Sequence, residues 1–459
     1  KIHAAMNKNQ RQLAEEKIPK LLFKQSFPAI IGLLVMSLYN VVDTIFIGQS
    51  VGTLGIAALT IAAPIQMLII AIAQTIGIGA SSIISRALGS KNIEEAESTL
   101  GNFFTLILVF GLITTILGLL FLTPLELIFG ATETILPYAN EYLSIILYGA
   151  VFLCFTAAAN NIIRAEGNAK FAMGIMIVST VINLILDPIL IFGFDMGLQG
   201  AAIATVTAQI ITSLLALQYF LGGKHSITIR LKNLKLRLST TRKILAIGAS
   251  SLTRQSAGSV SQAIMNHSLG FYGGDLAIAA FGIIAKVFMV VMMPMFGFVQ
   301  GMQPVLGFNY GAKKFKRAKE ALKYSMNAAT VFSIMAFVII MLFTRQIISV
   351  FTSDAELINM SVSAAKIVFI LTPFIGFQVI LSGLYQALGK AVKAIFLSIL
   401  RQLILLVPFV LLLPLFYGLE GVFYSFPAAD LFAGIITGWM LYREFKIFDR
   451  KALASTDTT

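Results

Sequence analysis

Apolar stretches of about 20 residues or more recur along most of this chain, and they dominate what it can fold into. Of 459 residues, 58% are hydrophobic and only 12% are charged, against roughly 25% charged residues in an average soluble domain. A water-soluble core cannot bury so much apolar surface at this length, so lipid is expected to cover much of it. The sequence therefore predicts an all-α membrane protein.

Twelve of these stretches are long enough to cross a bilayer as helices. We expect them at approximately 24–48, 54–83, 97–121, 135–160, 170–193, 198–221, 243–270, 276–304, 320–344, 362–386, 393–416 and 420–442. The basic residues fall mainly in alternate loops, and of the 34 lysines and arginines only Arg345 lies clearly in a loop on the other side. The positive-inside rule then places both termini in the cytoplasm. We expect a multi-pass protein of the cell inner (cytoplasmic) membrane.

The two halves of the chain repeat each other. GTLGIAALTIAA from Gly52 recurs as GDLAIAAFGIIA from Gly274, and GLQG from Gly197 recurs as GLEG from Gly418. Each repeat has six expected spans, so the two six-helix bundles share one orientation, with a pseudo-two-fold axis along the membrane normal. This plan favours a transporter. The expected parts are a cytoplasmic N-tail (1–23), an N-terminal bundle (24–222), a basic cytoplasmic linker (223–242), a C-terminal bundle (243–442) and a cytoplasmic C-tail (443–459).

Two aspartates, Asp43 and Asp187, lie inside apolar spans without a neutralising neighbour in sequence. A carboxylate at membrane depth costs at least a few kcal/mol and usually faces a cavity or an ion path. Asn183 shares a helical face with Asp187, and the rise per residue brings Asp43, Asp187 and Thr205 to a similar depth. Close like charges keep one carboxyl protonated. We therefore expect a coupling-ion site; the alternative is a set of hydrogen bonds between packed helices.

The second half carries no acidic residue at the matching positions. Its charges within expected spans are Arg254, Lys286, Arg401 and Asp430. Arg401 and Asp430 both approach the middle of the membrane, so we expect a structural ion pair there; a second ion site is the alternative. Arg254 and Lys286 have no obvious partner in sequence and are assigned no role beyond lining an aqueous cavity.

Several other classes of function lack support in the sequence. There is no HExxH, GxSxG or Walker A motif, so an enzyme is not expected. The single cysteine, Cys154, excludes an intrachain disulfide and a cysteine-based metal cluster. The histidines at 3, 225 and 267 have no other ligand nearby in sequence. No cofactor or metal is expected, and the basic residues follow membrane topology rather than a nucleic-acid surface.

Several segments together resemble the multidrug and toxic compound extrusion (MATE) family, particularly its MepA-like and DinF-like branches. They are NVVDTIFIG, ISRALGSKN, RAEGNAK, NLILDPILIFG, GLQGAAIAT, LRQ and PAADL. The resemblance implies a V-shaped antiporter, a monomer in the lipid bilayer, that exports cationic amphipathic drugs in exchange for protons or sodium. It implies a cation site of Asp43, Asn183, Asp187 and Thr205. It also indicates Asn160. We expect Asn160, Tyr39 and Asn40 to contact the substrate.

The coupling ion is open to two interpretations. An all-oxygen site at Asp43, Asn183, Asp187 and Thr205 suits Na⁺ as a hard cation, but a proton needs no complete coordination shell, so H⁺ is preferred. The NorM-like branch uses acidic residues in C-terminal helices 7 and 10, which this chain lacks. A flippase for a lipid-linked saccharide is a further alternative, because Arg254 and Lys286 could serve a cationic cavity.

Overall fold

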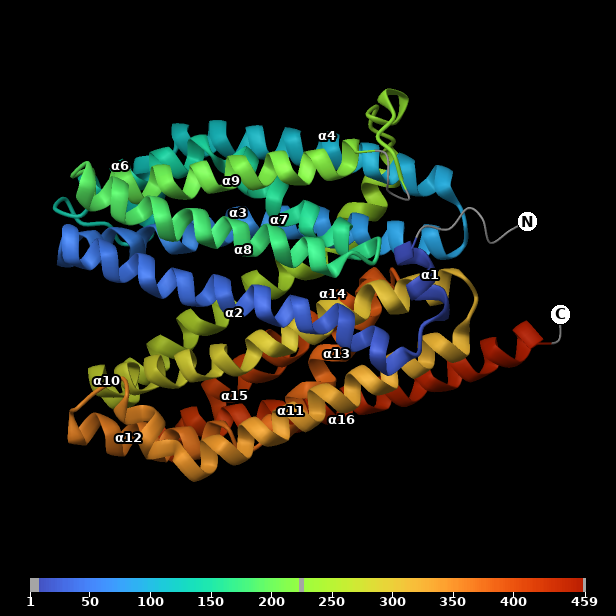
Figure 1. Ribbon diagram of the computed structural model, residues 1–459. Helices are drawn as coiled ribbons and strands as arrows, with labels where there is room; N and C mark the ends of the chain where they lie inside the picture. The colour runs from blue at the N-terminus through green and yellow to red at the C-terminus, as the bar shows by residue number, and fades with distance from the viewer. Residues whose placement is uncertain (1–7, 223–226, 457–459) are drawn as a thin grey trace. The chain divides into compact units, whose positions relative to one another are not determined.

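The computed structural model of the protein describes residues 8–222 and 227–456, and every regular element in these ranges is a helix (Figure 1). The all-α membrane class is thereby confirmed. The elements of the first half are α1 (Lys8–Glu15), α2 (Ile18–Ser50), α3 (Thr53–Gly89), α4 (Ile93–Leu120), α5 (Leu122–Ile128), α6 (Leu136–Tyr148), α7 (Ala150–Ala165), α8 (Ala169–Pro188), the π-helical turn η2 (Ile189–Gly193) and α9 (Gly197–Leu221).

The second half begins with a short 3₁₀ turn and is again helical. Its elements are η3 (Leu231–Asn233), α10 (Leu238–Gly311), α11 (Phe315–Ser349), α12 (Ala355–Val368), the 3₁₀ turn η4 (Thr372–Phe374), α13 (Ile375–Ala387), α14 (Ala391–Ile399), the π-helical turn η5 (Leu400–Leu406), α15 (Val407–Leu412) and α16 (Pro414–Thr456). Non-helical backbone angles at Gly274 divide α10, and those at Gly418 divide α16. Both glycines have positive φ, which they adopt without the steric cost of a Cβ.

The described ranges contain nine helices that are long and apolar enough to cross a membrane, or up to eleven when two bent pairs each count as one span. The pairs are α6 with α7, bent by 58°, and α12 with the helix from Thr372, bent by 45°. The exact count of twelve is therefore not confirmed. The expected span 243–270 is helical, as the first part of α10, but it is absent from the eleven. Arg254 and the serines and glutamines around it make this segment more polar than the others.

The helices also extend beyond the limits expected for the tails and the linker. In the N-tail α1 is already helical, and α2 begins at Ile18; α16 continues to Thr456, through most of the expected C-tail. Within the linker, residues 223–226 lie outside the described ranges, and so does His225. Residues 1–7, with His3, lie outside them too.

Contacts divide the described chain into two compact units. The N-terminal unit comprises the described residues of Lys1–Glu16 and Phe27–Gly248, and the C-terminal unit those of Lys17–Ser26 and Ala249–Thr459. At the 222-residue offset of the repeat, Ser26 corresponds to Gly248. In each repeat, therefore, the first turns of the leading helix (α2 or α10) belong to one unit, and the rest of that helix belongs to the other.

Glycines allow these first turns to pack closely within each unit. In the N-terminal unit, a Cβ added at Gly79 would stand 2.0 Å from the Ile244 carbonyl oxygen. In the C-terminal unit, a Cβ added at Gly301 would stand 2.1 Å from Ser26 Oγ. Gly79 and Gly301 are equivalent positions of the repeat. Small residues of this kind let membrane helices approach backbone to backbone.

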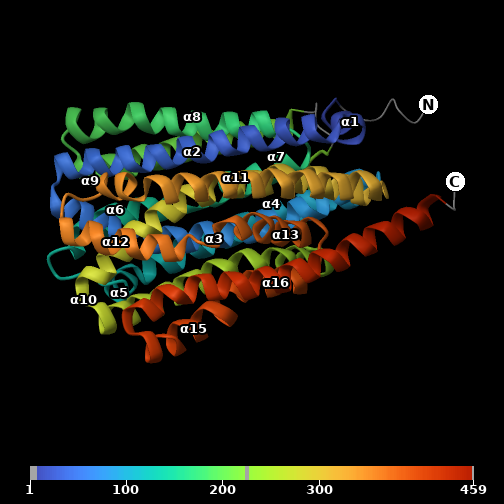
Figure 2. The ribbon, with the colours of Figure 1, turned by 90° about the horizontal axis from the view of Figure 1, so that it is seen from below.

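The part of the N-terminal unit that carries the aspartates is built from α2, α8 and α9. α2 runs beside α8 (Figures 1 and 2), and a Cβ at Gly32 would stand 2.8 Å from Met176 Sδ. α8 packs along α9. At the start of α9, Gly200 lies against the η2 backbone, where a Cβ would be 2.9 Å from the Leu190 carbonyl carbon. These close contacts fix the helices on which Asp43, Asp187 and Thr205 lie.

Candidate functional site

Two aspartate carboxyl groups are buried in the N-terminal unit, on neighbouring helices. Asp43 on α2 is 8% exposed and Asp187 on α8 is fully buried. The Asp43 charge reaches the Asp187 carboxyl, and both carboxyls also act on the hydroxyl of Tyr39. Asn183, one turn before Asp187, is also buried, at 3% exposed. The structure therefore brings together the three acidic and amide side chains that the sequence singles out on α2 and α8.

Tyr39 extends this cluster toward α9. Its ring is one turn before Asp43 on α2, and its hydroxyl lies beside both Asp187 and Thr205 without closing a hydrogen bond to either. Thr205 therefore approaches the cluster through Tyr39. Tyr39 was predicted to contact substrate; the structure shows that it also lies among the buried carboxyl groups.

The oxygens of this cluster are buried without hydrogen-bond partners in the described part of the chain. They are Asp43 Oδ1, Asn183 Oδ1, Tyr39 Oη and both carboxyl oxygens of Asp187. The amide nitrogen of Asn183 is used, because it donates to the Ser179 carbonyl at 2.9 Å. An ionised carboxylate buried without a partner is very costly. These oxygens are therefore suited to hold a proton, or another cation shared between them.

The backbone beside Asp187 departs from a regular α-helix. Pro188 has no N–H group, so the Leu184 carbonyl loses its usual helical donor. α8 ends at Pro188 and continues as the π-helical turn η2, where the Phe194 N–H donates to the Ile189 carbonyl at 3.0 Å. Single π-helical turns are frequent at functional sites. The sequence indicated a bent helix here, and the structure shows what form the irregularity takes.

Asn160 is not part of the carboxyl cluster. Its amide donates to the Ala172 carbonyl at 2.8 Å, and its oxygen accepts a hydrogen bond from Arg164 Nε at 2.9 Å. Arg164 is 2% exposed and also reaches Met176 Sδ at 3.6 Å. Asn160 thus holds a buried arginine where α7 meets α8. Asn40, by contrast, is exposed on α2.

A second polar pair near Asp43 was not singled out by the sequence. Gln66 Nε2 on α3 donates to the hydroxyl of Tyr142 on α6 at 3.2 Å, and this buried tyrosine interacts electrostatically with Asp43 and Asp187. A lone glutamine and a lone tyrosine in apolar spans are ordinary packing residues. No sequence signal links them, and only the fold places them beside the aspartates.

In the C-terminal unit, the structure joins Arg401 and Asp430. Arg401 Nε donates to Asp430 Oδ1, and Nη2 donates to Oδ2 at 3.3 Å. Asp430 is 1% exposed, and Gln378 Nε2 donates to its backbone oxygen at 3.2 Å. The pair is thus a two-point ion pair on a buried carboxylate.

The other two intramembrane cations of this unit lie against aromatic rings. The Arg254 guanidinium is 5.4 Å from the centre of the Phe296 ring. Lys286 is exposed, with its ammonium group 6.0 Å from the centre of the Phe351 ring. Both cationic groups are therefore placed for a cation–π contact with a phenylalanine ring. Across the described ranges, no group of three or more His, Cys, Asp or Glu side chains is arranged to hold a metal ion.

Known proteins share this fold along nearly the whole chain. A solved structure of the MATE multidrug transporter DinF-BH, in complex with a ligand, is 46% identical, with a TM-score of 0.87 over 94% of this chain and 97% of that one. A structure of MATE in the bent conformation is 27% identical, with a TM-score of 0.91 over 98% and 100% of the two chains.

Curated relatives cover the chain to a similar extent. The multidrug export protein MepA of Staphylococcus aureus is 25% identical over 429 residues, or 93% of this chain and 94% of that protein. The FAD transporter of Shewanella oneidensis is 28% identical over 447 residues, or 95% and 97%.

These similarities and the apolar helices define a multi-pass membrane transporter rather than an enzyme. The sequence model of one family, MatE, matches residues 28–189 and again residues 253–412, once in each half of the repeat. The chain belongs to the MatE family.

Proposed function

We propose that this transporter is a multidrug efflux antiporter that exports cationic amphipathic drugs in exchange for protons, with Asp43 and Asp187 as the coupling groups. The observation that carries the proposal is the buried cluster itself. Two carboxyls are buried there on neighbouring helices, and oxygens of both have no hydrogen-bond partner among the described residues. Such groups change their need for solvent and for partners when they gain or lose a proton.

Protonation can be coupled to packing through the contact between α2 and α8. A charged Asp43 needs water or a cation beside it, whereas a neutral one tolerates apolar neighbours. Binding of a proton would therefore let α2 repack on α8 next to the irregular turn at Pro188. That repacking removes the space and the negative charge that hold a cationic drug, so proton and drug compete. Loss of the proton to the cytoplasm restores the charge for the next drug.

The relatives support export of drugs. MepA is described as a multidrug export protein, and DinF-BH as a multidrug transporter. The chain covers more than nine-tenths of each of these proteins. We place this activity in the cell inner membrane with both termini in the cytoplasm, because the lysines and arginines concentrate in the loops of that side.

Sodium coupling is the first alternative, since Asn183 Oδ1 and the carboxyl oxygens are all available to a hard cation. We favour the proton because it needs no complete coordination shell. A flippase for lipid-linked saccharides is less favoured. It would need free cations for a pyrophosphate, whereas Arg254 and Lys286, the two candidates for that role, lie against aromatic rings.

The test uses everted membrane vesicles that contain the wild-type protein and are energised by respiration. Ethidium is added, and both its uptake and the pH gradient are followed with and without sodium. Proton-coupled export predicts that ethidium partly collapses the pH gradient in sodium-free buffer. Vesicles with the Asp43→Asn variant should show neither signal. Uptake that requires an imposed sodium gradient and ignores the pH gradient would establish the sodium alternative instead.

A further inference from the structure

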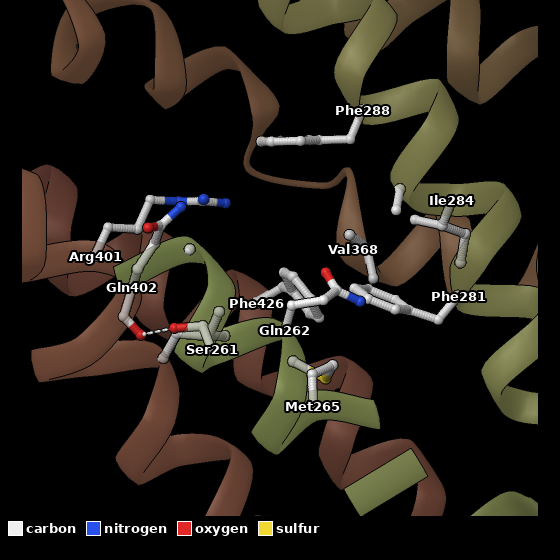
Figure 3. A pocket seen from close by; sticks show the side chains of 13 residues that line it. Ser261, Gln262, Met265, Phe281, Ile284, Phe288, Val368, Arg401, Gln402 and Phe426 are labelled. Carbon is white, nitrogen blue, oxygen red and sulfur yellow. Dashed lines mark hydrogen bonds between the residues drawn. The ribbon is translucent and has the colours of Figure 1, made fainter. Parts of the chain in front are cut away.

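A pocket of about 260 Å³ lies inside the C-terminal unit, apart from the aspartates of the N-terminal unit (Figure 3). Its walls come from both segments of α10, from α12, from the turn η5 and from α16. The lining residues are Gly258, Ser261, Gln262, Met265, Phe281, Ile284, Ala285, Phe288, Val368, Arg401, Gln402, Leu406 and Phe426. The function proposed above uses none of them.

Aromatic rings and polar groups face each other across this pocket. In Figure 3, Arg401 and Gln402 reach in from one side, while Phe281 and Phe288 stand on the other. The ring of Phe281 packs on Phe426 with centres 5.5 Å apart, and the Arg401 guanidinium is 5.4 Å from the centre of the Phe288 ring. An aromatic wall of this kind suits an aromatic ligand, because the edges and faces of rings pack favourably against one another.

The π-helical turn η5 (Leu400–Leu406) places Arg401 and Gln402 side by side at the pocket. Pro408, just beyond it, cannot donate an N–H to the helix. The donor that Pro408 lacks would serve the Ile404 carbonyl. Separately, the Gln402 carbonyl accepts a hydrogen bond from Ser261 Oγ on α10, at 2.7 Å. Wide turns of this kind often mark functional sites. The irregular backbone and the polar side chains thus occur at the same place.

Arg401 and Gln402 have hydrogen-bonding capacity that the described residues do not use. Arg401 gives Nε and Nη2 to Asp430, which leaves the two N–H groups of Nη1. Gln402 Oε1 is buried without a partner. Its amide offers one acceptor and a pair of donors, whichever way round it lies. The pocket therefore presents a donor from Arg401 next to an amide that can accept and donate.

We propose that this pocket binds a flat heteroaromatic ring through a cyclic imide edge, in which an N–H group lies between two carbonyls. One carbonyl would accept from Arg401 Nη1, and the imide N–H would donate to Gln402 Oε1, which satisfies the buried oxygen. The ligand ring should be neutral, because Asp430 already compensates the charge of Arg401 and no charge remains for an anionic ligand to balance. Pockets for drug-sized ligands hold roughly 300–1,000 Å³. The smaller volume here fits one ring system, either alone or as part of a larger molecule.

The test is equilibrium dialysis of lumazine, a bicyclic ring with an imide edge, against the purified full-length protein in detergent. We expect saturable binding at one site. Lumazine methylated at the imide nitrogen keeps its shape but loses the donor, so it should bind about tenfold or more weakly. Gln402→Met, similar in length but unable to accept the N–H bond strongly, should weaken lumazine by a similar factor and leave the methylated ring unaffected.

A matched pair of glycine variants tests the position of the site. Gly258 lines the pocket, where an added Cβ would make only ordinary contacts, 3.5 Å from Gln402 Oε1. Gly258→Leu should therefore fill the pocket and abolish binding. Gly282, on the second segment of α10, has open space around it, so Gly282→Leu should bind lumazine like the wild type.

The outcome is independent of drug export, because the Asp43→Asn protein should still bind lumazine normally. No lumazine binding by the wild type would overturn the proposal. So would equal binding of both rings, or equal binding by the two glycine variants.

Discussion

Asp43 and Asp187 lie on different helices, yet they face one buried cluster in which neither has a basic partner among the described residues. A structural carboxylate in a membrane protein is normally paired with a cation or fully hydrogen-bonded. Asp430 on α16, paired with Arg401, is an example in the same chain. The contrast between these two arrangements supports the proposed roles, with Asp43 and Asp187 exchanging a proton and Asp430 holding helices together.

The Asp43→Asn variant should lose nearly all drug export while it still inserts and folds. The amide keeps the shape of the carboxyl but cannot carry a titrating charge. Export of ethidium from cells is the measurement, and the thermal midpoint of the purified variant reports folding. Asp195→Asn is the matched control, since Asp195 is exposed beyond η2 and its positive φ is compatible with asparagine. Near-normal export by Asp43→Asn would refute the coupling role.

The Asp187→Asn variant should be severely impaired as well, and the double variant should be little worse than either single one. Groups that titrate as one coupled site give non-additive losses. The comparison requires initial export rates for all three variants at equal expression. If each single variant keeps part of the transport and the double variant multiplies the two deficits, the two aspartates act independently.

The sequence alone was sufficient to find the aspartates and the Arg401–Asp430 pair. A charge within an apolar run stands out because it is costly there, and the rise per residue gives its depth. Arg401 and Asp430 could be paired on this basis although they lie on different helices. The internal repeat likewise followed from recurring glycines such as Gly52 and Gly274, whose place in the backbone a side chain would strain.

Other parts of the site depended on tertiary packing. Gln66 and Tyr142 are single uncharged residues, and nothing in their local sequence indicates that they meet beside Asp43. Asn160 was expected to contact substrate, which stays a prediction; its hydrogen bonds to Arg164 and to the Ala172 carbonyl come from packing that the sequence does not reveal. The span 243–270 shows that mean hydropathy alone does not identify every long helix of this protein. Its helix forms in spite of polar residues, because neighbouring helices cover part of it.

Removal of one partner from the Arg401–Asp430 pair should destabilise the protein more than removal of both. A single change, Arg401→Met or Asp430→Leu, leaves a buried charge without a partner and should cost roughly 3–5 kcal/mol. The double change replaces both charges with apolar groups and should cost clearly less. Thermal unfolding in detergent provides the comparison. Equal midpoints for the single and double variants would show that the pair contributes no coupling to stability.

Gly301→Ala should destabilise the C-terminal unit. The new methyl group would stand 2.1 Å from Ser26 Oγ and 2.5 Å from the Ser26 backbone nitrogen, so α2 or α10 must shift. Overpacking of this kind costs about 1–3 kcal/mol. Gly282→Ala on the same helix meets open space and should be neutral or slightly stabilising. The thermal midpoints of the two variants should differ in that direction, and matching midpoints would contradict the close contact.

Glu126 provides a pH-dependent contribution to stability outside the membrane spans. It lies in the short helix α5, is fully buried, and has no hydrogen-bond partner for either carboxyl oxygen among the described residues. Burial disfavours its charged form and raises the pKa of this carboxyl from 4.5 to about 7. The folded protein therefore holds a proton on Glu126 over a pH range in which the unfolded chain has released it.

This difference in pKa sets the sign of the pH dependence. Below about pH 4.5 both states are protonated, and the contribution of Glu126 to stability is fully present. As the pH rises from there to about 7, the unfolded state binds fewer protons than the folded state, so stability falls, by up to roughly 3 kcal/mol. Above pH 7 the loss is complete.

Glu126→Gln keeps the shape without a titrating group, so its advantage over the wild type should grow from pH 5 to pH 8. Thermal midpoints at both pH values measure this, with Glu133→Gln, an exposed position, as the control. A constant difference between Glu126→Gln and the wild type at the two pH values would show that Glu126 is not the titrating group.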